Sequence, residues 1–209
     1  MAKRVTNPTQ RENIGYFNLN QCIYSSIAHE NKIDNIPGSD YLPYKNVELS
    51  KNKIILNLHK LFKHCINPIY RRYGHRLGLT SVYRNKKINK LLGGVENSQH
   101  IYGYAADLVL TDGTSSLELF NWCRINIPQY HQLIWEYPER ESFNSNAITG
   151  EYSWIHISYI EGNNFKENSL SSKDPKIHKK YEGENTFHLG NFTHKISTTE
   201  NITPVANPY

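Results

Sequence analysis

The sequence contains 209 residues with a formal net charge of +5 at pH 7, and 38% of its residues are apolar. This composition supports one hydrophobic core with extensions, or at most two small domains, and no stretch approaches the roughly 20 apolar residues of a membrane-spanning helix. Residues 1–80 carry 12 Lys/Arg against five Asp/Glu, but no recognition motif accompanies this charge, so we expect no nucleic-acid partner.

The N-terminal third of the chain has helical patterns. Residues 17–31 indicate a short helix. Over about residues 47–66 the apolar positions recur three and four apart, which is typical of one face of an amphipathic helix. Pro68 is expected to end or kink this helix, because proline lacks a backbone N–H and its ring collides with the preceding turn.

Strand and helix patterns alternate in the middle of the chain. Four short apolar segments predict strands at 78–84, 105–111, 131–137 and 152–160. A short helix over 85–92 is expected to stop at the Gly-Gly pair that follows it. Ser115, with Glu118 three residues later, is a capping-box pattern that opens a helix through about Cys123. The predicted fold class is therefore α+β, with helices flanking a small mixed or antiparallel sheet.

The composition changes after residue 160. The remaining residues are rich in Asn, Lys, Ser and Thr and have no usable periodicity. We therefore expect an N-terminal extension over 1–14, a folded domain over 15–160, and a polar C-terminal tail or arm over 161–209. Such a tail is weakly structured alone and can become ordered on a partner.

The three cysteines are Cys22, Cys65 and Cys123, and no CxxC or Cys/His spacing links them. Cys65 and Cys123 fall on apolar positions of predicted helices, so we expect buried free thiols. We expect neither a disulfide framework nor a thiolate zinc site.

Two of the predicted strands place polar side chains where they can meet. Side chains alternate along a strand, so Trp154 and His156 share one face. Glu136 lies at the end of the preceding predicted strand. If the two strands are neighbours, Glu136 and His156 project into one site. A carboxylate in this position is costly unless it has a partner or a function.

A His/Asp pair lies in the segment SQHIYGYAAD. Asp107 begins an apolar strand, and His100 lies just before a glycine-bearing turn. Two histidines and one aspartate are good zinc ligands, and three protein ligands leave a fourth position for water, as in a catalytic site. The spacing alone is equally compatible with unrelated core or surface residues.

The residues between these ligands carry a family resemblance. The pattern Ser98-x-His100-x-x-Gly103-x-Ala105-x-Asp107 resembles the SxHxxGxAxD signature of the zinc D-alanyl-D-alanine carboxypeptidase family, which includes vancomycin-resistance dipeptidases, phage endolysins and the hedgehog domain. The segments TSVYRNKKINKLLGG, QLIWE and WIHIS resemble its other conserved parts, and YFNLNQCIYSSIAHENKIDNIP resembles its phage-type branch. The resemblance covers roughly residues 15–160.

The resemblance implies a role for several residues. His100, Asp107 and His156 would bind Zn²⁺. Arg84 would hold the substrate carbonyl or the developing oxyanion. Ser98 would lie near the bound peptide, and Trp154 would form a wall of the site. For Arg84 and Ser98 the alternatives are a surface salt bridge and a simple turn residue.

The position of the general base differs from the position that part of the family uses. Many members place an acid three residues before the last histidine ligand, and that position here is Ser153. Glu136 matches the glutamate of the phage-type QLIxE pattern and is the preferred base. Glu151 is the alternative, although a regular strand would turn it away from His156.

The implied activity is zinc-dependent hydrolysis of amide bonds in peptidoglycan stem peptides, as a D-Ala-D-Ala carboxypeptidase or an endopeptidase. The first residues lack the apolar segment of a secretory signal. This favours a phage-encoded lysin, made in the cytoplasm and acting at the bacterial cell wall, either released or virion-associated. The alternative is a non-enzymatic zinc-binding component of a phage tail or virion, with residues 161–209 docking on neighbouring virion proteins.

Overall fold

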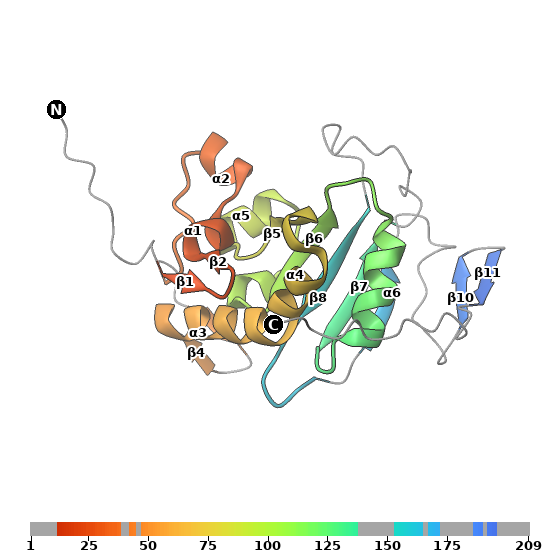
Figure 1. The fold of residues 1–209 in the computed structure, drawn as a ribbon. Coiled ribbons are helices and arrows are strands. Elements are labelled where there is room, and N and C mark those ends of the chain that lie inside the picture. Colours follow the sequence, from red (N-terminus) through yellow and green to blue (C-terminus); the bar gives the residue numbers. More distant parts are fainter. Residues whose placement is uncertain are drawn as a thin grey trace.

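The computed structural model describes residues 12–38, 42–44, 47–137, 153–164, 167–171, 186–189 and 192–195. Its centre is a five-stranded sheet with the strand order β5-β6-β8-β7-β9 (Figure 1). The strands are β5 (Leu77–Ser81), β6 (Ala105–Leu110), β7 (Gln132–Glu136), β8 (Trp154–Ser158) and β9 (Glu167–Ser171). All neighbours are antiparallel except β7 and β9, which are parallel. The mixed sheet and the four strands predicted before residue 160 are confirmed, each strand being somewhat shorter than predicted.

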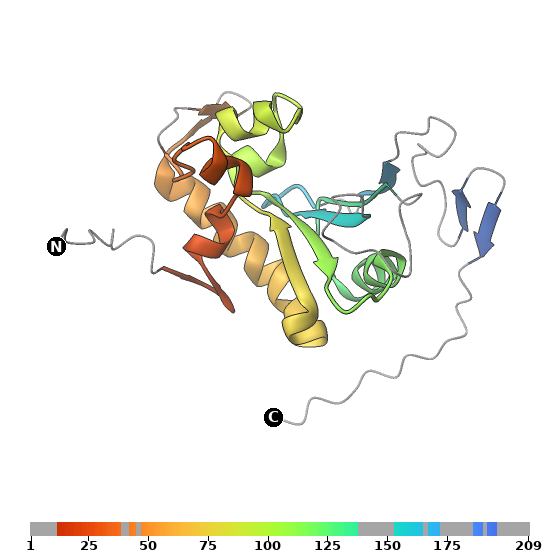
Figure 2. The ribbon, with the colours of Figure 1, turned by 90° about the horizontal axis from the view of Figure 1, so that it is seen from above.

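One face of this sheet packs on helices. Ala106 and Leu108 of β6, Trp135 of β7, and Ile155 and Ile157 of β8 are all at most 3% exposed. They belong to one hydrophobic core with residues of α3 (Lys51–Leu61), α4 (Asn67–Tyr73) and α6 (Ser116–Asn126). Figure 2 shows the run α3–α4 and helix α6 lying along the sheet. Because side chains alternate along strands, the opposite sheet face carries the polar residues.

Pro68 was expected to end or kink the helix, and the chain stays helical past Pro68 but changes helix type just before it. A π-helical segment, Phe62–Ile66, follows α3, and α4 then continues to Tyr73. At the end of the π segment, the Asn67 N–H donates to the Phe62 carbonyl, five residues back. Pro68 therefore falls in the first turn of a new helix, where its missing N–H costs little.

The predicted single helix over 17–31 is two short helices. They are α1 (Leu19–Ile23) and α2 (Ser26–Glu30), preceded by the strand pair β1 (Asn13–Ile14) and β2 (Phe17–Asn18). The side chain of Asn18 accepts from the Gln21 N–H, and that of Ser25 accepts from the Ala28 N–H. Each side chain caps a new helix and holds its own backbone extended, which interrupts a continuous helix.

The other predicted helices are confirmed. Helix α5 spans Lys86–Leu91, and Gly93 behind it is left-handed with φ of +70°. Helix α6 begins after Ser115, whose hydroxyl accepts from the Leu117 N–H rather than from that of Glu118. The remaining elements are β3 (Leu42–Tyr44), β4 (Val47–Leu49), β10 (Thr186–Leu189), β11 (Phe192–Lys195) and the 3₁₀ helices η3 (Gly74–Arg76) and η4 (Gln99–Tyr102).

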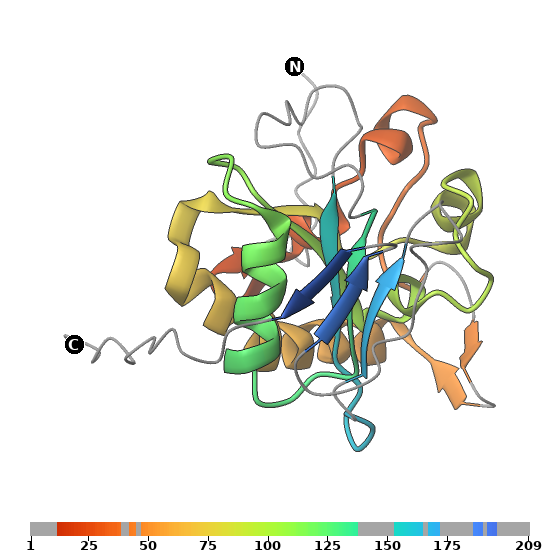
Figure 3. The ribbon, with the colours of Figure 1, turned by 90° about the vertical axis from the view of Figure 1, so that its right-hand side faces the viewer.

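The segment 161–209 contains more regular structure than its composition predicts. Strand β9 extends the central sheet beyond residue 160, and β10 pairs with β11 as an antiparallel hairpin (Figure 3). The proposed division of the chain at residues 14 and 160 remains a prediction.

The described part of the chain holds three free cysteines. Cys22, Cys65 and Cys123 are each 0% exposed, so the expected buried thiols are confirmed. Among the described residues, none of the helices combines the length and the apolar character needed to cross a lipid bilayer.

Candidate metal centre and active site

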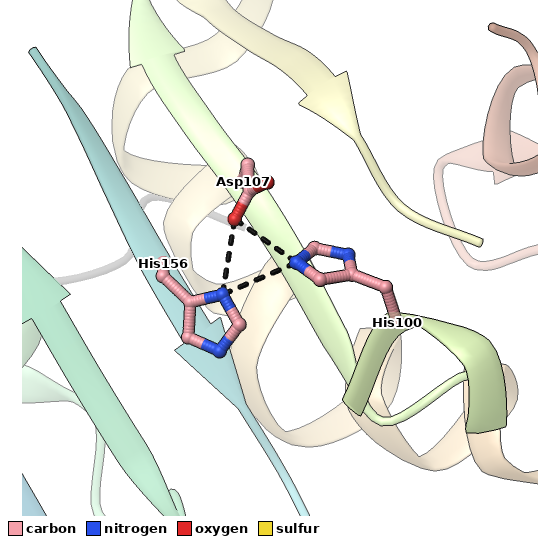
Figure 4. A group of neighbouring side chains, drawn as sticks. All are labelled: His100, Asp107 and His156. Carbon is pink, nitrogen blue, oxygen red and sulfur yellow. Dashed lines mark hydrogen bonds and ion pairs between the residues drawn. The ribbon is translucent and has the colours of Figure 1, made fainter. Parts of the chain in front are cut away.

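His100, Asp107 and His156 meet on the polar face of the sheet (Figure 4). They come from η4, β6 and β8, respectively. Asp107 Oδ1 lies 3.0 Å from His156 Nδ1 and 3.2 Å from His100 Nε2, and the two nitrogens are 3.2 Å apart. The side chains are between 2% and 12% exposed. One nitrogen of each imidazole and one carboxylate oxygen therefore converge on a single point.

The backbone explains how residues so distant in sequence meet. Asp107 and His156 are direct partners in the antiparallel pair β6–β8, so their side chains share one face. His100 is brought there by the turn at Gly103, which ends η4 with φ of +71°. A Cβ on Gly103 would lie 2.8 Å from the Ile54 carbonyl oxygen. The motif needs glycine here for both reasons.

Outer hydrogen bonds fix which nitrogen of each imidazole faces the centre. His100 Nδ1 lies 2.7 Å from the Val82 carbonyl oxygen, to which it donates its proton. His156 Nε2 lies 3.1 Å from Gln99 Oε1, which accepts in the same way. The nitrogens that face the centre are then Nε2 of His100 and Nδ1 of His156.

The electrostatics of the cluster keep the carboxylate ionised. Burial acts to raise the pKa of Asp107, but the neighbouring His100 and His156 outweigh burial and hold this pKa far below its usual range. Burial lowers the pKa of His100, and Arg84 and His156 act in the same direction. The cluster is therefore an anionic carboxylate beside an imidazole that burial keeps neutral.

This donor set fits a metal ion. The two inward imidazole nitrogens and a carboxylate oxygen lie within 4.8 Å of one another. A cation would satisfy all three groups at once. Two imidazoles and one carboxylate are a common ligand set for zinc, and the outer hydrogen bonds are of the kind that orients ligating histidines.

Arg84 lies beside this cluster. One of its terminal nitrogens is 3.8 Å from Asp107 Oδ2, and the side chain is 16% exposed. Burial lowers the pKa of Arg84, whereas the charges of Asp107 and Glu136 raise it. A guanidinium stays protonated at any physiological pH, so Arg84 places a fixed positive charge next to the three converging groups.

A buried asparagine fixes the backbone on both sides of Arg84. Asn35 Nδ2 donates to the Tyr83 carbonyl oxygen at 2.9 Å, and its Oδ1 accepts from the Asn85 N–H at 2.8 Å. Asn35 is 6% exposed. Its amide thus holds both peptide groups that flank Arg84. Nothing in the sequence singles out Asn35, because its partners are about 50 residues away.

Glu136 shares the face of the histidines. In the pair β7–β8 it lies opposite Trp154, and Ile134, two residues earlier, lies opposite His156. The predicted pairing of these two strands is therefore found. Ser153, the position of the acid in part of the family, is 4% exposed, and its hydroxyl accepts from the Trp135 Nε1–H on the core side. Glu151 lies outside the described residues.

A comparison with protein-family models finds the Peptidase M15 family, matching residues 45–158. This match covers more than half of the chain. The chain belongs to the peptidase M15 family. The match includes His100, Asp107, His156, Arg84 and Glu136. No curated protein matches the sequence.

The family resemblance seen in the sequence is thus confirmed, whereas the assignment to a phage-type branch remains a prediction. In this M15 peptidase, Ser98 is 8% exposed and precedes η4, where its carbonyl oxygen accepts from the Ile101 N–H. A turn role is therefore present, and contact with a peptide stays a prediction. The ring centroids of Trp154 and Tyr137 are 4.9 Å apart. Trp154 thus belongs to an aromatic pair beside Glu136.

Two residues of the M15 peptidase site were missed by sequence reasoning. Asn35 lies far from the motif in the chain. Gln99 lies inside the motif, directly before His100, but its neighbour in space is His156. The sequence feature that could have identified Gln99 is its position, because it is a polar residue between two site residues in SQH.

Proposed function

We propose that this M15 peptidase is a zinc-dependent hydrolase of amide bonds in peptidoglycan stem peptides. The observation that carries the proposal is the convergence of His100 Nε2, Asp107 Oδ1 and His156 Nδ1 on the sheet face that also carries Glu136. A structural site needs only ligands. An ionisable carboxylate and a buried guanidinium next to the ligands are the groups that hydrolysis requires.

His100, Asp107 and His156 would hold the zinc ion through these three atoms. When bound, zinc supplies Lewis acidity and lowers the pKa of water toward about 7. The inward lone pairs are held in place by the Val82 carbonyl and the Gln99 amide, so the ligands are oriented before the ion arrives.

Glu136 would act as the general base. Its carboxylate accepts a proton from the attacking water and delivers it to the leaving amine. It lies on the same sheet face, two residues along β7 from the position opposite His156, and Trp154 opposite it would form one wall. Ser153 cannot replace it, because its hydroxyl is engaged with Trp135 in the core.

Arg84 would stabilise the charge that develops on the substrate carbonyl oxygen. A preorganised cation at a water-poor position acts strongly on such charge. The buried contacts of Asn35 with the flanking peptide groups would hold the backbone of Arg84 in position. Ser98 would contribute a hydrogen bond to the peptide.

The proposed substrate class follows from family membership, with the activity of a D-Ala-D-Ala carboxypeptidase or an endopeptidase. We further propose a phage-encoded lysin, made in the cytoplasm and acting at the cell wall as a released or virion-associated enzyme. The excess of positive charge in residues 1–80 suits an anionic wall.

The test combines metal analysis with a hydrolysis assay. The purified protein is expected to contain about one zinc ion per chain and to release new amino groups from purified peptidoglycan. Glu136→Ala should keep the zinc and lose the hydrolysis, while Glu118→Ala, an exposed acid on α6, should keep both. Full hydrolysis by Glu136→Ala would remove Glu136 from the role of base.

The same assay separates the alternative function. A protein that binds zinc in the wild-type form but releases no amino groups would be a non-enzymatic component of a phage tail or virion. Its partners would then be virion proteins bound through residues 161–209.

A further inference from the structure

Gln99 connects two of the three converging residues. It belongs to η4 and directly precedes His100, yet its Oε1 lies 3.1 Å from Nε2 of His156 on strand β8. The contact spans 57 positions of the sequence. The side chain thus reaches from the segment that supplies one ligand to the imidazole that supplies another.

Two contacts compete for the proton of a neutral His156. Gln99 Oε1 only accepts, so it favours the proton on Nε2, which leaves Nδ1 with a lone pair facing His100 Nε2 and Asp107 Oδ1. The opposite tautomer, with the proton on Nδ1, is favoured by a stronger acceptor. Asp107 Oδ1 is 3.0 Å from Nδ1, and a carboxylate is a better acceptor than an amide. A proton on Nδ1 would remove this lone pair from the centre.

We propose that Gln99 is a positioning residue that holds His156 in the tautomer with its proton on Nε2 and thereby keeps Nδ1 open for the metal. This inference rests on the proposed zinc function of the site. Gln99 acts through His156 and need not contact the substrate.

The side-chain role can be tested apart from the backbone. The carbonyl oxygen of Gln99 accepts from the Tyr104 N–H at 3.0 Å, which holds the turn closed. Substitution of the side chain leaves this bond intact. Gln99→Leu keeps the bulk and removes the acceptor, whereas Gln99→Glu keeps an acceptor oxygen at nearly the same place.

The first measurement is zinc affinity, by competition with a chromophoric chelator after removal of bound metal. Gln99→Leu should bind zinc roughly 10- to 100-fold more weakly, the usual effect of losing an outer partner of a ligating histidine. Gln99→Glu should stay near the wild-type affinity. If Gln99 only filled space, Gln99→Leu would bind zinc more tightly than Gln99→Glu, because leucine keeps the bulk without adding charge. Gln129→Leu, the same change at an exposed loop position, is the matched control and should bind like the wild type.

The second measurement is the tautomer itself, from histidine side-chain ¹⁵N spectra of the metal-free protein at neutral pH. The wild type and Gln99→Glu should carry the His156 proton on Nε2, and Gln99→Leu should move it to Nδ1. Should Gln99→Leu fail to fold by circular dichroism, Gln99→Ala is compared with Gln99→Glu in both experiments.

Different failures have different meanings. Wild-type zinc affinity and an unmoved proton in Gln99→Leu would overturn the inference and leave the zinc function standing. An unchanged affinity with a raised KM would also overturn it, because the side chain would then serve the substrate. If Asp107→Ala binds zinc as tightly as the wild type, both the zinc function of this site and the role of Gln99 are wrong.

Discussion

Asp107 lies directly opposite His156 across the antiparallel strands β6 and β8, with Oδ1 3.0 Å from Nδ1. Both residues therefore belong to the rigid sheet, and only His100 comes from a turn. Groups held on sheet strands keep their separation better than groups on loops. The cross-strand pair is thus the fixed part of the candidate metal centre.

Asp107→Asn should abolish tight zinc binding without unfolding the protein. The amide has the same shape as the carboxylate but lacks its charge, and loss of a ligand should cost more than the roughly 10-fold minimum for an outer partner. Chelator competition measures the affinity, and circular dichroism checks the fold. Zinc binding as tight as that of the wild type would show that the ion binds elsewhere.

Arg84→Ala should leave the zinc content unchanged and lower kcat/KM by about 10²-fold, the typical effect of losing one group that stabilises an oxyanion. Arg84→Lys should recover only part of this, because a lysine lacks the planar fork of donors and loses its proton more readily when buried. Release of amino groups from peptidoglycan measures the rate. Arg71→Ala, an exposed arginine, is the control and should match the wild type.

Gly103→Ala should destabilise the fold by about 2 kcal/mol or more, because a left-handed backbone is costly for alanine and its Cβ would collide with the Ile54 carbonyl oxygen. Gly93→Ala shares the positive φ, but its Cβ would meet nothing within 4 Å. It should therefore cost about 1 kcal/mol and keep zinc affinity. Urea denaturation measures the loss of stability in the two variants. Equal losses would mean that the close approach to α3 is unimportant.

The buried thiols should make the protein less stable at alkaline pH. Burial raises the pKa of Cys22 from 9.0 to about 12, and it also raises the pKa of Cys65 and Cys123. Above about pH 9 the unfolded chain releases thiol protons that the folded chain retains, so stability falls as pH rises. Urea midpoints between pH 7 and 10 measure how steeply stability falls with pH, and Cys22→Ala should make this fall smaller. A thiol reagent at pH 8 should react only after unfolding.

The strand alternation and the turn into β6 can be predicted from local sequence, whereas the meeting of His100, Asp107 and His156 was expected only from the family resemblance. Alternation along β8 places Trp154 and His156 on one face, and the fixed spacing from His100 through Gly103 to Asp107 describes a single tight turn into a strand. Such features depend on neighbouring residues only. The pairing of β7 with β8, on which the position of Glu136 depends, entered the sequence analysis only as a condition, because a long polar connection separates the two apolar segments.

Other features depend on contacts that are distant in sequence. Asn35 and Gln99 gain their roles from partners about 50 residues away. A π-helical segment precedes Pro68, and the proline lies in the first turn of α4, where its missing N–H costs little. Composition alone also gave no sign of β9, whose pairing with β7 is set by tertiary structure.

The parallel strand β9 has a practical consequence for the boundaries of the protein. It covers the outer edge of β7, the strand that ends in Glu136. A chain cut after Ile160, where the composition changes, would leave the N–H and C=O groups of β7 along that edge without their partners. An open edge of this kind invites strand-to-strand association between molecules. Versions that end there should therefore aggregate, whereas a chain that retains β9 keeps the strand edge beside Glu136 covered.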